Sequence, residues 1–245
     1  MRRNRTAVQY TRAMRDRYGM WPTWLPDTHM TVGDYGRIHQ GMFVRAGHLE
    51  DCDVDLAVSR STSPGDHIFS TAGVRQATLN GEAELQASGL GARVRIDFGK
   101  SFGLFVALVD SREVRFEDPV GLAARLDERA SGGQWHRDHC VVTNVLQARS
   151  ALIAVGSSRG GHLELEGGVP TPDLLTWLTS GVCVLSETNV SYRAIMRHGC
   201  TPLFRVAALV RSGELIPRGA QLNAPRLREI DARIQAHELD PSRSE

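Results

Sequence analysis

The segment WHRDHC (135–140) gathers the side chains that are best suited to bind a metal ion. His136, His139 and Cys140 lie close together in it, and imidazole nitrogen and thiolate sulfur are the ligands that zinc prefers in proteins. A zinc finger requires a second ligand pair at a fixed spacing, and no such pair follows. A metal-dependent enzyme that uses these three residues is therefore a minor alternative, and the sequence predicts no bound metal or other cofactor.

A second group of possible ligands lies in EDCDVD, where Asp51, Asp53 and Asp55 occupy alternate positions. On a strand these carboxylates would share one face and could contact a hard cation. No acidic calcium-binding loop follows them, so a solvated strand edge is the favoured interpretation. The chain also lacks a Gly-x-Ser-x-Gly elbow and a phosphate-binding Walker loop, and no cysteine has an activating neighbourhood. The sequence thus predicts no catalytic residues.

Composition places the chain among ordinary globular proteins, with 245 residues, 41% hydrophobic and 23% charged. The net charge of +1 argues against a protein that binds nucleic acid through bulk charge. The first residues lack the continuous apolar segment of a signal peptide, and the four cysteines are far apart, so we expect free thiols in the cytoplasm. No apolar run approaches the roughly 18 to 20 residues of a membrane-spanning helix.

Two regularly alternating strands are expected between Val74 and Gly99. Polar side chains occupy the even positions from Gln76 to Ser88, and after a break at 88–91 the even positions become apolar. By themselves such strands favour a half-buried antiparallel sheet, although they also have the alternation over about ten residues that a transmembrane β-strand requires. The larger apolar side chains of this segment are Leu79, Leu85, Val94, Ile96 and Phe98.

The other expected elements are helices at 5–17 and 119–130 and strands at 139–156, 181–196 and 201–210. The helix at 119–130 begins with Pro119 and places Leu122 and Leu126 on one face. The strand at 181–196 alternates, with Val182, Val184, Val190 and Tyr192 on one face. After a linker rich in proline and glycine, a short amphipathic helix at 225–238 carries Leu227, Ile230 and Ile234 on one side.

Two of these segments resemble a known family. CVVTNVLQARSALIAV (140–155), preceded by the helix at 119–130, resembles a central strand of the gasdermin pore-forming domain, in which a helix leads into a VVT-x-VLQ-like strand. TPLFRVAALVRSGEL (201–215) resembles the closing strand of the same domain. The order of helix, long strand, variable hairpin and closing strand agrees with the family, and the resemblance covers roughly residues 100–213.

The resemblance implies an α+β fold, with a twisted antiparallel β-sheet and flanking helices. Residues 1–213 would form the pore-forming domain, and residues 214–245 a linker and a short inhibitory helix. A small bacterial-type gasdermin would be inactive in the cytoplasm until an activating protease releases the tail. It would then form a homo-oligomer and insert two β-hairpins per subunit into the inner (plasma) membrane, in antiviral cell-death defence.

The resemblance also gives roles to residues of this chain. The first inserting hairpin would be 74–98, and the second would join 139–156 to 181–196. The tail residues Leu227, Ile230 and Ile234 would inhibit, and Arg218-Gly219 is a candidate cleavage bond. Anionic lipid headgroups would meet the N-terminal arginines, which are Arg2, Arg3, Arg5, Arg12, Arg15 and Arg17.

The chain departs from the family at its first cysteine. Bacterial gasdermins commonly carry an acylated cysteine near the N-terminus, whereas the first cysteine here is Cys52. The main alternative function is a non-enzymatic β-rich binding module whose tail helix packs permanently and whose strands never leave the core.

Overall fold

The computed structural model describes residues 5–23, 28–39, 42–78, 93–167, 173–210 and 212–218. Within these residues the chain forms antiparallel sheets flanked by helices, which confirms the α+β class expected from the sequence. The elements are α1 (Arg5–Tyr18), β1 (Trp21–Pro22), β2 (Asp34–His39), β3 (Met42–His48), the 3-10 helix η1 (Leu49–Cys52), β4 (Val58–Arg60), β5 (Gly65–Ser70), β6 (Val74–Thr78), β7 (Arg93–Phe98), β8 (Gly103–Phe116), α3 (Pro119–Ser131), β9 (Cys140–Ala148), β10 (Ser150–Gly156), β11 (Gly161–Gly167), α4 (Leu174–Ser180), β12 (Val182–Thr188), β13 (Val190–Met196), β14 (Cys200–Leu209) and β15 (Leu215–Arg218).

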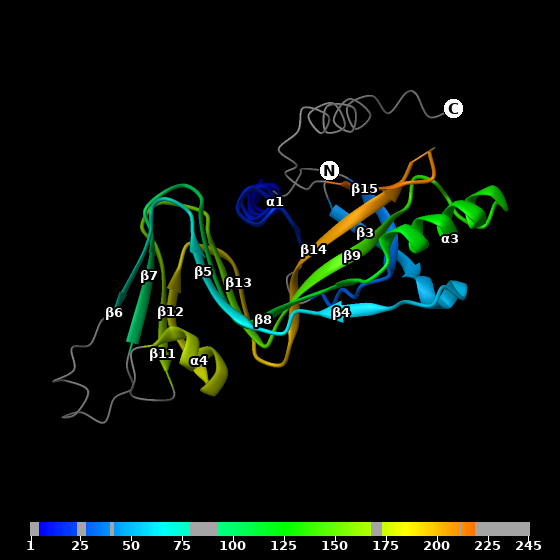
Figure 1. The fold of residues 1–245 in the computed structure, drawn as a ribbon. Helices are drawn as coiled ribbons and strands as arrows, with labels where there is room; N and C mark the ends of the chain where they lie inside the picture. The colour runs from blue at the N-terminus through cyan, green and yellow to red at the C-terminus, as the bar shows by residue number, and fades with distance from the viewer. Residues whose placement is uncertain are drawn as a thin grey trace.

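Two sheets organise these strands. The larger sheet has 11 strands, with the central order β1-β14-β9-β8-β10-β13, and the smaller has four strands in the order β12-β11-β7-β6. The long strand β8 links the two ends of the larger sheet, because its first half pairs with β5 and β10 and its second half with β4 and β9. Figure 1 shows the small sheet folded down at the end of the molecule opposite α3.

Helix α1 forms the amphipathic element that the sequence predicts at 5–17. Ala7, Tyr10 and Met14 are buried at helical spacing, whereas Arg12 and Asp16 face solvent. The buried side packs against one face of β8 and β10, in a cluster with Leu104 and Ile153 among others. None of the helices among the described residues is long and apolar enough to cross a membrane.

Helix α3 confirms the helix predicted at 119–130. The carboxylate of Asp118 accepts a hydrogen bond from the Gly121 amide at 2.8 Å and caps the N-terminus, directly before Pro119. Leu122 and Leu126 are fully buried on one face. The helix ends where Gly133 adopts a positive φ of 72°, which an L side chain rarely allows.

Each of the two long strands expected at 139–156 and 181–196 divides into two. The strand expected at 139–156 breaks at Arg149 into β9 and β10. β9 pairs with β14 and β8, whereas β10 pairs with β13, which belongs to the segment 181–196. The second breaks at Asn189, which adopts a left-handed φ of 53°. The expected second hairpin therefore consists of β10–β11 and β12–β13, without β9.

The expectation that Val182, Val184, Val190 and Tyr192 share one face is wrong. Val182, Val184 and Val190 pack in the cluster between the two sheets, but Tyr192 packs in the cluster beneath α1. The pairing register of β13 with β10 shifts between Val155 and Gly156, where a β-bulge interrupts the alternation. That bulge turns Val190 and Tyr192 to opposite faces.

The chain folds back sharply where β7 meets β8 and β10 meets β11, and Phe98 fills the inside of this bend. A Cβ atom added at Gly156 would lie 2.3 Å from Cγ of Phe98, and one added at Gly103 would lie 2.6 Å from its Cδ1. Gly103 and Gly156 are paired in the sheet, so together they leave the space that the ring occupies. The fold-back therefore requires glycine at both positions.

We predict that Gly156→Val destabilises the protein by about 1–3 kcal/mol, because the new side chain must displace the Phe98 ring in a packed core. Chemical denaturation of the purified variant measures the change. Gly132→Ala is the matched control, since the nearest atoms would lie 3.7 Å from its Cβ. Adding Phe98→Ala to Gly156→Val should cost less than the sum of the two single changes, and strict additivity would contradict the proposed contact.

Candidate functional site

The small sheet of β6, β7, β11 and β12, hereafter the tip sheet, carries most of the predicted inserting residues. Its inner face packs against β8, β10 and β13, which together with the neighbouring β5 are hereafter the base strands, and Figure 1 shows these strands beside the tip sheet. Val94, Ile96 and Phe98 on β7 are at most 1% exposed, and Leu163 and Leu165 on β11 are fully buried beside them. The apolar face that the alternation predicts is therefore a core face in this structure.

Helix α4 closes the space between the tip sheet and the base strands. Asp173 caps it by accepting hydrogen bonds from the amides of Leu175 and Thr176 at 3.2 Å. Trp177 is fully buried, and its ring lies so close to the backbone of Gly167 that a Cβ there would be 2.1 Å away. The sequence patterns predicted no role for Trp177 or for the glycines of the bend. The glycines of the bend could have been recognised because glycine recurs at the ends of the alternating segments.

The outer face of the tip sheet is polar and carries paired charges. Arg93 lies 3.5 Å from Glu166 on the neighbouring strand, and Arg95 donates a 2.8 Å hydrogen bond to Asp97, which raises the pKa of the arginine. Across the other ladder, Ser186 donates to Glu164 at 2.7 Å. These side chains are half-exposed, so each pair adds little stability. The tip sheet is thus apolar on one face and charged on the other.

The described arginines of α1 lie at the surface or against aromatic rings. Arg12 is 85% exposed and lies 3.9 Å from Asp16. The guanidinium of Arg15 stacks 4.2 Å from the centre of the Trp21 ring, and that of Arg17 lies 5.6 Å from the Phe69 ring. The backbone of Arg5 begins the helix, and Arg2 and Arg3 lie outside the described residues.

Several other predicted residues also lie outside the described part of the chain, namely Leu79, Leu85, Gly219, Leu227, Ile230 and Ile234. Arg218 is described and ends β15, which pairs with β14. Its carbonyl oxygen accepts a 2.7 Å hydrogen bond from the indole nitrogen of Trp21. Leu215–Arg218, which the sequence analysis placed in a linker, are therefore part of the larger sheet.

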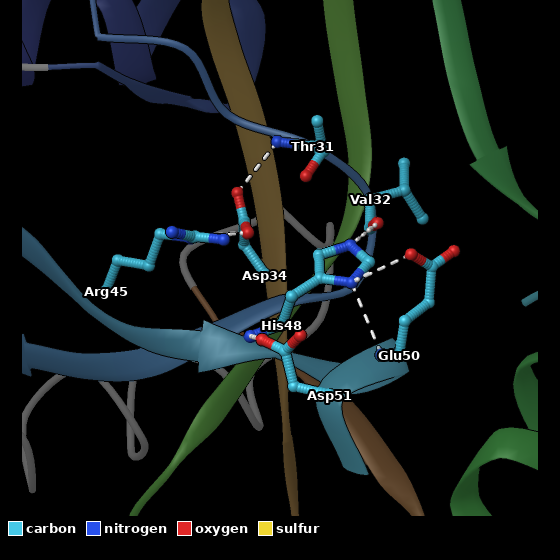
Figure 2. A network of polar contacts seen from close by, with 7 residues as sticks. All are labelled: Thr31, Val32, Asp34, Arg45, His48, Glu50 and Asp51. Carbon is cyan, nitrogen blue, oxygen red and sulfur yellow. Dashed lines mark hydrogen bonds and ion pairs between the residues drawn. The ribbon is translucent and has the colours of Figure 1, made fainter. Parts of the chain in front are cut away.

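The acidic segment at 51–55 is not a strand. Asp51 is the third residue of η1 and caps its start by accepting a 3.3 Å hydrogen bond from the His48 amide, and Asp53 adopts a left-handed φ of 55° after its end. Figure 2 shows how the polar groups here satisfy one another. Buried Asp34 accepts from Arg45 at 2.6 Å and from the Thr31 amide at 2.8 Å. These contacts of Asp34 tie the loop before β2 to β3.

The possible zinc ligands do not converge. Cys140 is 1% exposed and pairs with Gly36 inside the sheet, where burial raises the pKa of its thiol. His139 packs instead against the rings of Tyr35 and Trp135, with ring centres 5.4 and 5.5 Å away. Within the described residues, no group of three or more His, Cys, Asp or Glu side chains could hold a metal ion.

No protein-family model matches the chain, and no curated protein matches its sequence. Among solved structures, the chain is similar to a bacterial gasdermin from Bradyrhizobium tropiciagri, with a TM-score of 0.36 and 13% identity over 84% of this chain and 88% of that one. It is also similar to the cryo-EM structure of the gasdermin A3 membrane pore, with a TM-score of 0.35 and 11% identity over 88% of this chain and 95% of that one. Both belong to the family that the sequence resembles. These likenesses concern the course of the backbone, and no residue role is transferred from them.

The environment of His139 predicts a loss of stability in mild acid. Burial lowers the pKa of His139 below its ordinary value of about 6.5, since the packed aromatic site disfavours the charged imidazolium. The unfolded chain therefore binds a proton more readily, and the free energy of unfolding should fall as the pH drops from about 6.5 toward the lower folded value. Denaturation at several pH values measures this slope. His139→Gln should flatten it, and His198→Gln at an exposed position should leave it; an unchanged slope in His139→Gln would assign the effect elsewhere.

Proposed function

We propose that this chain is an autoinhibited pore-forming protein that inserts its tip sheet into a membrane after its tail is released. One observation carries the proposal. The tip sheet is an amphipathic ribbon whose apolar face, with Val94, Ile96 and Phe98, is covered by folding back onto its own base strands and α4. Its other face carries charges that can face water. A sheet with one apolar and one charged face can move its apolar face from the protein core into lipid while its charged face stays in water.

Energetics favour a membrane over water as the alternative environment. Fully burying one large apolar side chain contributes about 1.5–3 kcal/mol, so releasing Ile96, Phe98, Leu163 and Leu165 into water together would cost about 6–12 kcal/mol, which is comparable with the roughly 5–15 kcal/mol that stabilise a whole protein. Hydrocarbon receives the same side chains at no such cost. The fold-back is therefore stable in water, and lipid removes the penalty for opening it.

The edges of the tip sheet favour assembly of several copies. Among the described strands, β6 pairs only with β7 and β12 only with β11, so each has an edge with unpaired backbone groups. Water satisfies these groups in solution, but hydrocarbon cannot. Insertion therefore requires pairing with neighbouring copies, which supports a homo-oligomeric ring.

We further propose that residues 219–245 hold the protein inactive, with Leu227, Ile230 and Ile234 docked on the folded domain. A protease would cut close to the Arg218-Gly219 bond, and the hydrogen bond from Trp21 to the Arg218 carbonyl would keep β15 in place after the cut.

Exposed Arg12 and Arg17 on α1 would contact anionic headgroups. The protein would thus move from the cytoplasm to the inner membrane, in antiviral cell-death defence.

The first prediction of this proposal is dye release from vesicles that contain phosphatidylglycerol. A variant with a protease site inserted between Gly219 and Ala220 should release trapped dye only after it is cut. The uncut variant, and the wild type treated with the same protease, are the controls. Sealed vesicles with a folded, cut protein would favour the alternative of a soluble binding module.

The second prediction is that a reversible lock across the bend blocks release. Phe98→Cys with Gly156→Cys, in a Cys183→Ser background, brings two Cβ atoms to 2.7 Å, from which a small shift reaches the roughly 3.8 Å of a disulfide. The oxidised, cut protein should leave vesicles sealed, and dithiothreitol should restore release. Each single cysteine variant controls for the substitution itself. Equal release in the oxidised and reduced states would show that the fold-back need not open.

A further inference from the structure

The bend between the tip sheet and the base strands preserves the pairing register of the two central strands. In the tip sheet Val94 pairs with Leu165 and Phe98 with Gly161. In the base Gly103 pairs with Gly156 and Val109 with Ser150. The unpaired segments between these ladders, 99–102 and 157–160, have the same length. Straightening the bend would therefore join both ladders without any slip of one strand along the other.

The two outer strands do not share this property. On one side Ser70 pairs with Phe105 and Val74 with Phe98, so the bend holds three residues (71–73) against six (99–104). On the other side Gly156 pairs with Val190 and His162 with Thr188, so five residues (157–161) lie against Asn189 alone. Only the pairing of β7 and β8 with β11 and β10, hereafter the central ladder, is already in register for an extended state.

The straight central ladder would place Lys100 directly opposite Arg159. Side chains alternate strictly along a strand, so both would lie on the face of Val94, Ile96 and Phe98. Like charges directly opposite one another destabilise a sheet. The segments 99–102 and 157–160 contain no acidic residue that could offset this repulsion. An anion is therefore needed between the two cations if the ladder straightens.

In the folded-back structure these two basic groups are not paired with each other or with acids. Both side chains are exposed, and among the described residues neither has an ion pair, in contrast to Arg93, Arg95 and Arg193 in the same ribbon. The stem of Lys100 lies across Gly73, where an added Cβ would be 2.8 Å from its Cγ. The charges thus remain free for a ligand that arrives with the membrane.

We propose that Lys100 and Arg159 form a binding site for the phosphate of an anionic lipid headgroup, and that this site exists only when the central ladder straightens. The inference rests on the proposed insertion of the tip sheet. The apolar side chains Val94, Ile96 and Phe98 would lie in hydrocarbon on one side of this site, and the base strands beneath α1 would stay outside. Anionic lipid then lowers the cost of straightening, which couples insertion to the lipid composition.

A charge exchange tests the site. Dye release by the cut protein is compared between vesicles of phosphatidylcholine alone and vesicles that also contain phosphatidylglycerol. Lys100→Glu replaces the repulsion by a cross-strand ion pair with Arg159, so the ratio of the two release rates should fall roughly fivefold or more. Arg60→Glu on β4 makes the same change of charge away from the bend and should keep the wild-type ratio. Lys100→Glu with Arg159→Glu should lose release from both vesicles.

A cysteine pair tests the register independently of the lipid dependence. Ser101→Cys with Ser158→Cys places thiols on residues that face each other in the straight ladder, so a disulfide should form on leaking vesicles. Ser101→Cys with Ser157→Cys tests a slip of one residue and should not form one. Two results would overturn the Lys100–Arg159 site alone. One is leakage by a protein in which Ser101→Cys and Ser157→Cys are cross-linked. The other is a ratio of the two release rates in Lys100→Glu that equals the wild-type ratio. Absence of leakage from every vesicle by the cut protease-site variant without further substitutions would instead refute pore formation.

Discussion

The structure depends on how one amphipathic ribbon covers its own apolar face. The tip sheet has no other element broad enough to bury Ile96, Phe98 and Leu165, so the chain turns back and lays this face on β8 and β10. The turn is tight because Phe98 lies where Gly103 and Gly156 provide no side chain. Helix α4 then fills the remaining space with Trp177. Each of these contacts has meaning only in the folded-back state.

The two central base strands, the first half of β8 and β10, are therefore buried on both faces, which explains their sequence. Leu104, Val106 and Leu108 contact the cluster beneath α1, whereas Phe105 and Ala107 contact the tip sheet. A strand covered on both sides reads as a continuous apolar run and loses the alternation that marks a half-exposed strand. The tip strands keep their alternation because their outer face remains in water. The two halves of one ribbon thus carry different patterns for one physical reason.

Function, in the proposal made here, follows from the same division. A protein that stores an amphipathic sheet against its own core needs no catalytic group, only a cover that can be removed and a medium that accepts the apolar face. Three of the possible ligands at 136–140 and 51–55 have structural roles instead. Cys140 lies inside the sheet, His139 packs against two aromatic rings, and Asp51 accepts a hydrogen bond at the start of η1. Their spacing suggested chemistry, but these contacts explain them as parts of the fold.

The sequence by itself determined the elements whose signals are local. Asp118, Pro119, Leu122 and Leu126 specify α3 through a cap and a periodic face, and the alternation at Val94, Ile96 and Phe98 specifies a two-faced strand. Tertiary structure alone decided what that face touches, because the same alternation suits a core and a lipid. It also decided where the long strands at 139–156 and 181–196 break, since Arg149 separates two strands with different outer partners, β14 for β9 and β13 for β10, and Asn189 separates strands of different sheets. Local propensity acts within a strand, whereas a bend and a register are properties of pairs of strands far apart in the chain.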